Sequence, residues 1–204
     1  MALSLSVPTR TLTIGIFTYI GQGAGLAAAT GVRPFLPPLL AGGLARADVA
    51  IDFEGGSFAF LESDWFLAVV FGLTVVWYVL GRARPGGERE RLLLPLAAIL
   101  GALLFAGLLE SGGYPFWIGA IGGGAVAALA ALTAGGLVKG ARARLDPGPA
   151  ALLTVWVDLV ALAVAAGSAL LWPLGFVALV LLVMLAVRAR SGRDRKYEGL
   201  RTLR

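Results

Sequence analysis

Charged side chains within long apolar segments are the residues most able to do chemistry in this sequence. Asp158 is surrounded by Leu, Val, Trp and Ala, and Arg33 separates two apolar stretches. A charge at the centre of a bilayer costs at least ~2.5–3.5 kcal/mol on insertion scales, which makes such residues functional candidates. Asp158 could carry a proton, couple to a cation or balance a cationic substrate. It could equally be a structural acid, hydrogen-bonded to another helix or paired with Arg33.

Arg33 is the second candidate, and two readings of it stay open. A guanidinium offers a bidentate fork for an anionic group. The free N–H groups at the start of the following short helix would add to that attraction. Arg33 could instead be a side chain that extends to the membrane surface and marks the cytoplasmic boundary.

Four polar residues near apolar segments extend the predicted pathway. Glu110 ends an apolar segment close to Tyr114, and it could guard an external entrance or be a solvated acid at a helix end. Gln22 and Thr30 flank several glycines and could line a pathway or hydrogen-bond between helices. The predicted substrate or ion pathway therefore comprises Asp158, Arg33, Thr30, Gln22, Glu110 and Tyr114.

The sequence of 204 residues contains no Cys and no His. Disulfides, thiolate chemistry, the usual zinc sites, His-ligated haem and a Ser–His–Asp triad are thereby excluded. No pairing of a nucleophile with a base is visible among the remaining residues. We therefore expect no enzymatic activity, no metal site and no cofactor.

The composition indicates a membrane protein. The chain is 58% hydrophobic and 14% charged, whereas soluble domains are ~45–50% apolar and ~25% charged. Its net charge is +5, and the positive charges lie in short segments beside apolar runs. That placement is typical of topology signals and not of nucleic-acid binding. The predicted fold is all-α, a polytopic transmembrane helix bundle that forms a single domain over residues 1–204.

Six apolar blocks can be assigned to membrane spans. A helix needs about 20 apolar residues to cross a hydrocarbon core of ~30 Å, and the first block is long enough for more than one segment. About six to seven spans are therefore expected. The blocks are Thr11–Ala45, Trp65–Leu80, Leu92–Leu109, Phe116–Val138, Ala150–Leu171 and Trp172–Val187.

The first block is predicted to be a broken helix or hairpin near residues 31–38. Its second part, Pro34–Ala45, is only half the length of a span, and Pro34 could open it because the first helical position needs no N–H. A similar interruption follows Glu110. The predicted helix breaks are Gly31, Pro34, Pro37, Pro38, Gly113 and Pro115.

A spacing that occurs twice in the sequence suggests that residues 11–81 and 92–187 form an inverted repeat. Pro-Phe precedes Gly-Gly by eight residues at both 34–43 and 115–124. Inverted repeats commonly place broken helices around a site at the membrane midplane in transporters. The alternative is chance, because Gly, Ala, Pro and Leu are abundant in this chain.

Basic residues alternate with the apolar blocks. Segments 82–91 and 139–149 and the tail 188–204 are basic, whereas segment 46–64 contains five acids and one Arg. The positive-inside rule places the basic segments and the C-terminus in the cytoplasm. The side of the N-terminus depends on whether Pro34–Ala45 crosses the membrane.

Small residues four apart predict close helix contacts. The spacing occurs at Gly21/Gly25, Gly119/Gly123 and Gly136/Gly140.

Three motifs carry a resemblance to a known family. They are Ala28–Pro37, Lys139–Arg144 followed by Val155–Asp158, and Lys196–Arg201. Together they resemble the bacterial membrane-protein family called domain of unknown function 4126, over most of the chain. The resemblance implies a small bacterial inner-membrane protein. That family usually has an acidic pair near Asp158, where this chain keeps one acid, and a Glu and an Asp where this chain has Trp77-Tyr78.

These observations predict a small transporter or channel of the bacterial inner membrane, for an unidentified solute or ion, with Asp158 as the coupling group. One alternative is a protein that binds or translocates lipid, with Arg33 on a headgroup phosphate. Another is a non-catalytic scaffold or partner subunit. The expected partners are membrane lipids, anionic lipid at the basic tail and a second copy of the chain, but no nucleic acid.

Overall fold

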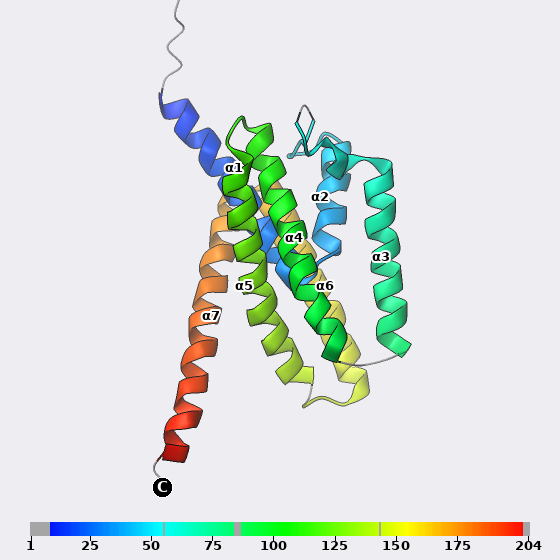
Figure 1. Ribbon diagram of the computed structural model, residues 1–204, viewed down its shortest axis with the longest axis vertical. Coiled ribbons are helices and arrows are strands. Elements are labelled where there is room, and N and C mark those ends of the chain that lie inside the picture. The colour runs from blue at the N-terminus through cyan, green and yellow to red at the C-terminus, as the bar shows by residue number, and fades with distance from the viewer. Residues whose placement is uncertain (1–8, 55, 84–86, 143, 202–204) are drawn as a thin grey trace, which may run out of the picture.

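The computed structural model describes residues 9–54, 56–83, 87–142 and 144–201, and every regular element within them is helical. The long helices lie roughly side by side (Figure 1). In chain order the elements are α1 (Thr9–Val32), α2 (Leu36–Arg46), the 3-10 helix η1 (Ala59–Glu62), α3 (Asp64–Ala83), α4 (Gly87–Ser111), α5 (Phe116–Arg142), α6 (Pro147–Leu170) and α7 (Trp172–Arg201).

Four helices are long and apolar enough to cross a membrane, within the part of the chain that the structure describes. They cover Leu92–Ser111, Phe116–Arg142, Gly148–Leu170 and Trp172–Arg190. A shorter apolar stretch, Asp64–Val79, belongs to α3. These helices agree with the predicted helical membrane bundle, and the number of six to seven spans stays a prediction.

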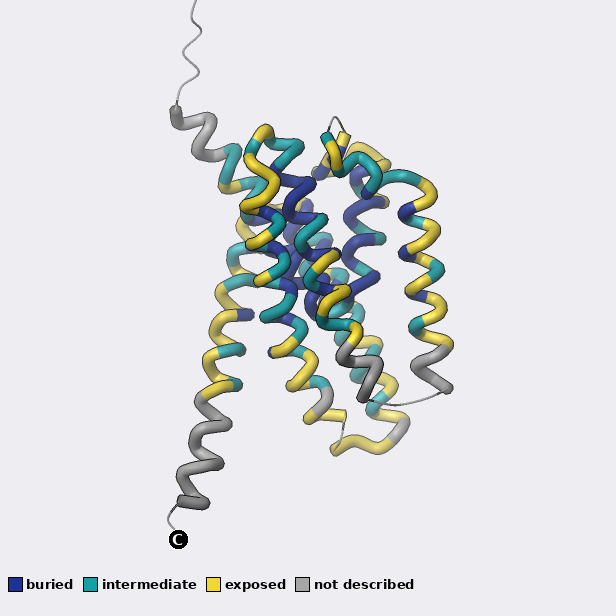
Figure 2. Tube along the Cα trace, in the orientation of Figure 1, coloured by how far each residue is buried: buried dark blue, intermediate teal, exposed yellow. Residues whose placement is uncertain are grey.

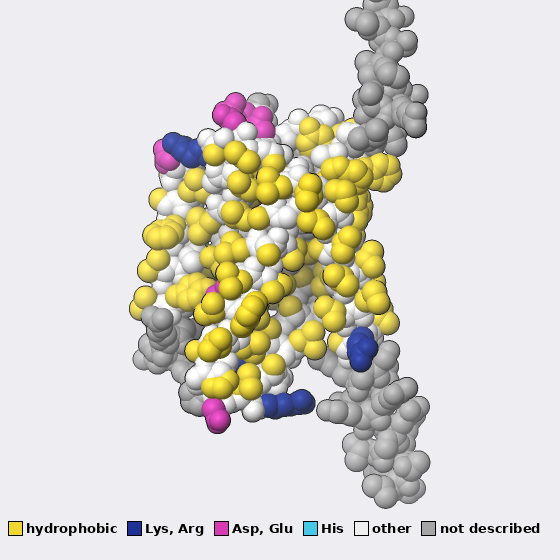
Figure 3. Space-filling model, turned by 180° about the vertical axis from the view of Figure 1, so that it is seen from behind, with side chains coloured by type: hydrophobic (Ala, Val, Ile, Leu, Met, Phe, Trp, Pro, Cys, Tyr) yellow, Lys and Arg dark blue, Asp and Glu magenta, His cyan; other side chains and the backbone are white. Residues whose placement is uncertain are grey.

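The outer surface is apolar, as expected where lipid is the solvent. Large side chains on three helices are mostly exposed: Ile121 at 69%, Leu152 at 63% and Met184 at 63%. Figure 3 shows hydrophobic side chains over most of one face, with charged groups gathered towards its two ends. The protein is therefore built to be embedded in a membrane.

The first predicted block folds as a hairpin with one short limb. Helix α1 ends at Val32, because the ring of Pro34 disfavours a helical conformation at the residue before it and supplies no N–H itself. Helix α2 has 11 residues, which gives a length of about 16 Å, half of a bilayer core. In Figure 1 the chain reverses near mid-height, and α2 returns to the end of the bundle where α1 begins.

The predicted breaks in this block need correction. Pro34 lies before α2 and does not open it, since α2 begins at Leu36. Pro37 and Pro38 were predicted to interrupt the helix, but they lie within its first turn. The first four N–H groups of a helix have no acceptor within it, so two prolines cost nothing there.

The second predicted break is a turn at the end of the bundle. Helix α4 ends at Ser111 and α5 begins at Phe116. Gly113 has φ of 77°, a left-handed conformation that glycine adopts without steric cost. This turn and the α1–α2 reversal lie at different heights in Figure 1. The inverted repeat stays a prediction.

Helix α1 lies at the centre of the bundle and packs against α4, α5, α6 and α7. Its close approach to α7 depends on Gly21, where a Cβ atom would overlap the carbonyl oxygen of Trp172. On the opposite helix, a Cβ atom at Gly175 would overlap the carbonyl oxygen of Gly21. Small residues therefore let the two backbones touch, as expected for membrane helices.

Two of the three predicted glycine pairs are at such contacts. Gly25 faces Ser168, and Gly119 and Gly123 face the backbone of α4. The prediction for Gly136/Gly140 is wrong, because a Cβ atom at either position would meet nothing within 4 Å.

Helix α3 packs less extensively against the rest of the bundle than the other long helices do. It packs against α2 and η1, and Figure 1 shows it at the edge of the bundle. Figure 2 shows buried residues concentrated in α1, α2 and the second half of α4, towards the end that carries segment 46–64. The opposite half holds fewer buried residues among those that the structure describes.

The three predicted basic segments lie partly outside the described residues. Residues 84–86, 143 and 202–204 are not described, nor are the side chains of 80–91, 139, 147 and 191–201. The backbone of the predicted tail is helical as far as Arg201. Contact of this tail with anionic lipid stays a prediction.

Candidate functional site

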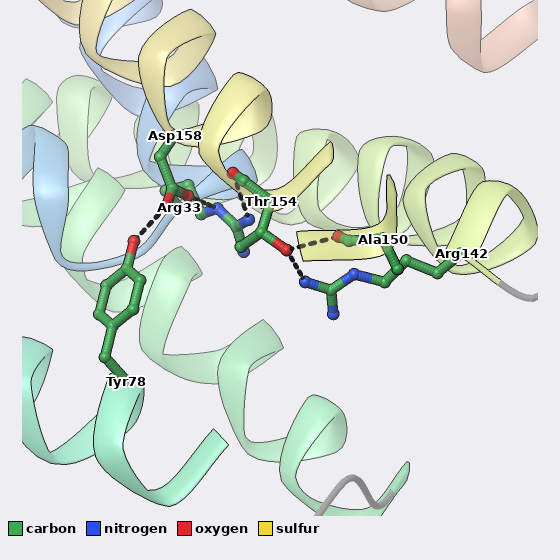
Figure 4. A network of polar contacts seen from close by, with 6 residues as sticks. All are labelled: Arg33, Tyr78, Arg142, Ala150, Thr154 and Asp158. Atoms are coloured by element: carbon green, nitrogen blue, oxygen red, sulfur yellow. Dashed lines mark hydrogen bonds and ion pairs between the residues drawn. The ribbon is translucent and has the colours of Figure 1, made fainter. Parts of the chain in front are cut away.

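Arg33 and Asp158, the two leading candidates, form an ion pair. Arg33 lies at the reversal between α1 and α2, and Asp158 lies midway along α6. The Nε atom of Arg33 pairs with Oδ1 of Asp158 (Figure 4). The side chains are 21% and 14% exposed, respectively. Each charge is thus neutralised by the other in a part of the bundle where an isolated charge would be costly.

Tyr78 completes the coordination of Asp158. Its hydroxyl donates to Oδ2 of Asp158 across the space between α3 and α6. Both carboxylate oxygens therefore have a partner, one from the reversal between α1 and α2 and one from α3. The neighbouring Trp77 contacts the ring of Phe35, with centroids 6.3 Å apart. These aromatic side chains connect the far half of α3 to the rest of the molecule.

Thr154 extends the network one turn along α6. Its carbonyl oxygen accepts from Nη2 of Arg33 at 3.4 Å. Its hydroxyl accepts from Nη2 of Arg142 and donates to the carbonyl of Ala150 at 3.1 Å. Figure 4 shows Thr154 between the two arginines.

These residues line a cavity of about 350 Å³. Its wall carries two arginines, Arg33 and Arg142, and one acid, Asp158, together with polar groups of Tyr78 and Thr154. Apolar residues complete it. A volume of this size is sufficient for a small ligand.

The pairing has a structural and a functional interpretation. An acid paired with Arg33 is the geometry that the structural alternative predicts. However, an ion pair that served only to hold helices together would need no open space beside it. Its location on a cavity wall is what makes it a candidate binding site.

The structure places the other predicted residues away from this cavity. Thr30 is fully buried and donates to the carbonyl of Leu26 in its own helix, at 2.7 Å. Gln22 lines a second cavity of about 320 Å³ near the acidic segment. Its amide donates to the carbonyls of Ala169 at 2.7 Å and Ala50 at 3.2 Å. Gln22 thus ties α1 to α6 and to the segment after α2.

Glu110 and Tyr114 lie near the end of the bundle that carries segment 46–64. A carboxylate oxygen of Glu110 accepts from the backbone N–H of Ser57 at 2.7 Å, so this acid holds the connection between α2 and α3. The ring of Tyr114 packs on Tyr19 with centroids 6.0 Å apart. Neither is brought to Asp158.

Three residues of the network were missed by the sequence reasoning. Tyr78 attracted attention only as a departure from the family pattern. Thr154 is four residues before Asp158 and so shares a helix face with it, a signal that could have found it. Arg142 was interpreted only as part of a basic topology signal and of the Lys139–Arg144 motif.

The described residues offer no evident metal site. No group of three or more acidic side chains is placed to hold a metal ion in the ranges that the structure describes.

An all-helical bundle with an apolar surface and a paired charge beside a cavity defines a class of polytopic membrane protein. A family model described as domain of unknown function (DUF4126) matches residues 20–191. The chain belongs to this family, and the resemblance found in its motifs is confirmed. No curated protein and no solved structure matches the chain.

Proposed function

We propose that this protein is a small membrane transporter whose substrate site is the cavity beside Arg33 and Asp158. The observation that supports this most is an ion pair on the wall of a cavity, at the point where α1 is interrupted and α2 begins. Interrupted helices and ionisable residues are the usual materials of a substrate site inside a membrane. The proposal involves binding and movement of a solute and no catalytic step.

Two cavities at different depths support a route through the protein. Gln22 and Arg33, which line different cavities, are separated by about 16 Å along α1. Leu26, Ala29 and Thr30 lie between them and are buried. A solute could pass only if this packed region opened, and the hairpin of α1 and α2 is the element whose movement would open it.

The ion pair gives this movement a trigger. Arg33 is on the hairpin and Asp158 is on α6, so a ligand or a proton that neutralised either charge would weaken the link between the two elements. Release of the Tyr78 hydroxyl would also free the far half of α3. Binding at the cavity would thereby favour an opened arrangement.

Lipid handling is a second candidate, and one observation favours it. The cavity is bordered by α3 and α6 at the edge of the bundle, and its wall includes Val155, 56% exposed, and Tyr78, 39% exposed. A cavity with such a wall could accept a headgroup from the side. A pure scaffold role receives less support, because a scaffold needs a filled interior.

The proposed setting is the inner membrane of a bacterium. The positive-inside rule would place the α3–α4 and α5–α6 connections and the C-terminus in the cytoplasm. The cavity near Gln22 would then face the outside.

Uptake into liposomes that contain the purified protein tests this function. We expect a panel of labelled ions and small metabolites to include one that enters faster than into protein-free liposomes. Asp158→Asn and Arg33→Gln should each abolish that uptake, whereas Asp146→Asn, an exposed acid before α6, should preserve it. Uptake unaffected by the first two variants would place the route elsewhere and contradict the proposal.

A further inference from the structure

Two arginines from distant parts of the chain reach the same residue of α6. Arg33 comes from the α1–α2 reversal and Arg142 from the last residue of α5. Arg33 donates to the carbonyl of Thr154 and Arg142 to its hydroxyl. Figure 4 shows the two guanidinium groups directed towards Thr154 from opposite sides.

The cavity beside them has an excess of positive charge. Among the described residues, the charged side chains on its wall are Arg33, Arg142 and Asp158, and these three groups together carry one net positive charge. The acids of segment 46–64 lie at the far end of the bundle (Figure 1). An anion entering this cavity would therefore be attracted and a cation repelled.

Both guanidinium groups have N–H donors that the contacts described above do not use. An arginine carries five N–H donors, of which Arg33 uses Nε on Asp158 and one on Thr154. Arg142 uses one on Thr154. The remaining N–H groups of the two side chains have no acceptor among the described residues, and they border open space.

We infer that the ligand of this cavity carries an oxyanion, such as a phosphate group, bound between Arg33 and Arg142. This inference rests on the proposed function, because it names the substrate class of the same site. Two guanidinium forks match the several oxygens of one phosphate group. The Thr154 hydroxyl accepts from Arg142 and donates to the carbonyl of Ala150, so it helps to hold the Arg142 guanidinium in place.

Asp158 has a positioning role in this arrangement. Its pairing with Nε fixes the plane of the Arg33 guanidinium and leaves the outer edge of the fork for the ligand. The oxyanion could belong to a free solute or to a lipid headgroup. Both present the same chemistry to the two arginines.

The test is saturable stabilisation of the full-length protein by two probes. Inorganic phosphate is added to detergent-purified protein, with sodium chloride at equal ionic strength as the reference. In parallel, nanodiscs containing phosphatidic acid are compared with nanodiscs of phosphatidylcholine alone. Each is repeated with Arg142→Gln, Arg142→Lys and Arg144→Gln, the last being an exposed arginine two residues away that does not line the cavity.

We expect one probe to stabilise the wild-type protein, with Arg142→Gln weakening its binding about tenfold or more. Arg142→Lys should recover only part of the loss, and Arg144→Gln should bind as the wild type does. A response to phosphate identifies a free oxyanion, and a response only to phosphatidic acid identifies a lipid headgroup. Either result supports the inference.

The inference is overturned if neither probe stabilises the protein, or if Arg142→Gln and Arg144→Gln lose binding equally. These outcomes remain distinguishable from failure of the proposed function. Uptake of a cation that ignores Arg142 would overturn the inference and preserve a transporter. Saturable phosphate binding without any uptake would support the inference and remove the transporter.

Discussion

The Arg33–Asp158 pair has further partners on α3 and α6, namely Tyr78 and Thr154, and its two charges depend on each other. Both side chains are largely removed from solvent, so loss of one leaves the other poorly compensated. We expect Asp158→Asn and Arg33→Gln each to lower the free energy of unfolding by about 1–3 kcal/mol, a range discounted from the larger values of fully buried pairs.

A variant that removes both charges tests more directly whether Arg33 and Asp158 interact. Removing both charges leaves no unpaired one, so the Arg33→Gln/Asp158→Asn protein should lose less stability than the two single changes added together. The coupling energy should be about 0.5–3 kcal/mol, measured by unfolding in detergent. Strict additivity would contradict a direct interaction.

Tyr78 is expected to contribute through its hydroxyl. Tyr78→Phe keeps the ring and removes the donor to Asp158, so unfolding should become easier by about 1.5–3 kcal/mol, the usual contribution of a hydrogen bond to a charged group. Val79→Ala, at an adjacent position that is 59% exposed, is the control and should change stability less. Equal effects of the two changes would indicate general loosening of α3.

Glu62 at the end of η1 makes stability depend on pH. Burial, followed by the charge of Asp52, raises its pKa above 4.5. A raised folded-state pKa means that stability is fully present below pH 4.5 and falls as pH rises through the folded-state pKa. Glu62→Gln should therefore raise the Tm at pH 7 and leave it nearly unchanged at pH 4. An equal rise in Tm at both values would contradict this origin.

At the scale of the helices, α1 depends on small residues for its central position. Gly21→Ala would introduce a Cβ atom into the backbone of α7, and overpacking of this kind costs about 1–3 kcal/mol. The matched control is Gly136→Ala, where nothing lies within 4 Å. Since alanine favours a helix over glycine, that change should be neutral or stabilising by up to about 1 kcal/mol. Comparison of the two Tm values tests the packing of α1, and equal losses would contradict it.

The helices themselves could largely be predicted from the sequence. Apolar length and proline positions are local properties, so the blocks beginning at Trp65, Phe116 and Trp172 each appear within a residue of an observed helix start. The errors were at Pro37 and Pro38, because a proline that ends one helix and a proline that begins another look alike without knowledge of the register. The contacts of Gly136 were not predictable, since spacing identifies a helix face but not what that face meets.

At the scale of the whole molecule, charge is divided between the two ends of the bundle. The end of α3 and the start of α4 lie at one end of the bundle, as do the end of α5 and the start of α6, and segment 46–64 lies at the other with the beginning of α1 (Figure 1). Because the chain has no Cys, single cysteines report the side cleanly. Leu145→Cys should react with an impermeant maleimide only from the cytoplasm, and Ser57→Cys only from outside. Labelling of both from one side would contradict this topology.

The candidate site could be predicted only in part. The cost of a charge in lipid identified Arg33 and Asp158 from composition alone, and their pairing was one of the two alternatives. Their cavity, with Tyr78 and Arg142 on its wall, results from contacts between helices remote in sequence, which no local pattern encodes. Gln22 lines a cavity, but that cavity is not the one beside Arg33 and Asp158.

The most direct test of the Arg33–Asp158 cavity as a substrate site is ligand-induced stabilisation across a panel of ions, small metabolites and lipids. A ligand at a hundredfold excess over its Kd should stabilise the wild-type protein by about 2.7 kcal/mol. Our model predicts at least one solute that does so and that fails with both Asp158→Asn and Arg33→Gln. No stabilising solute, with both variants merely less stable than the wild type, would mean that the pair only holds helices together and would contradict the proposed function.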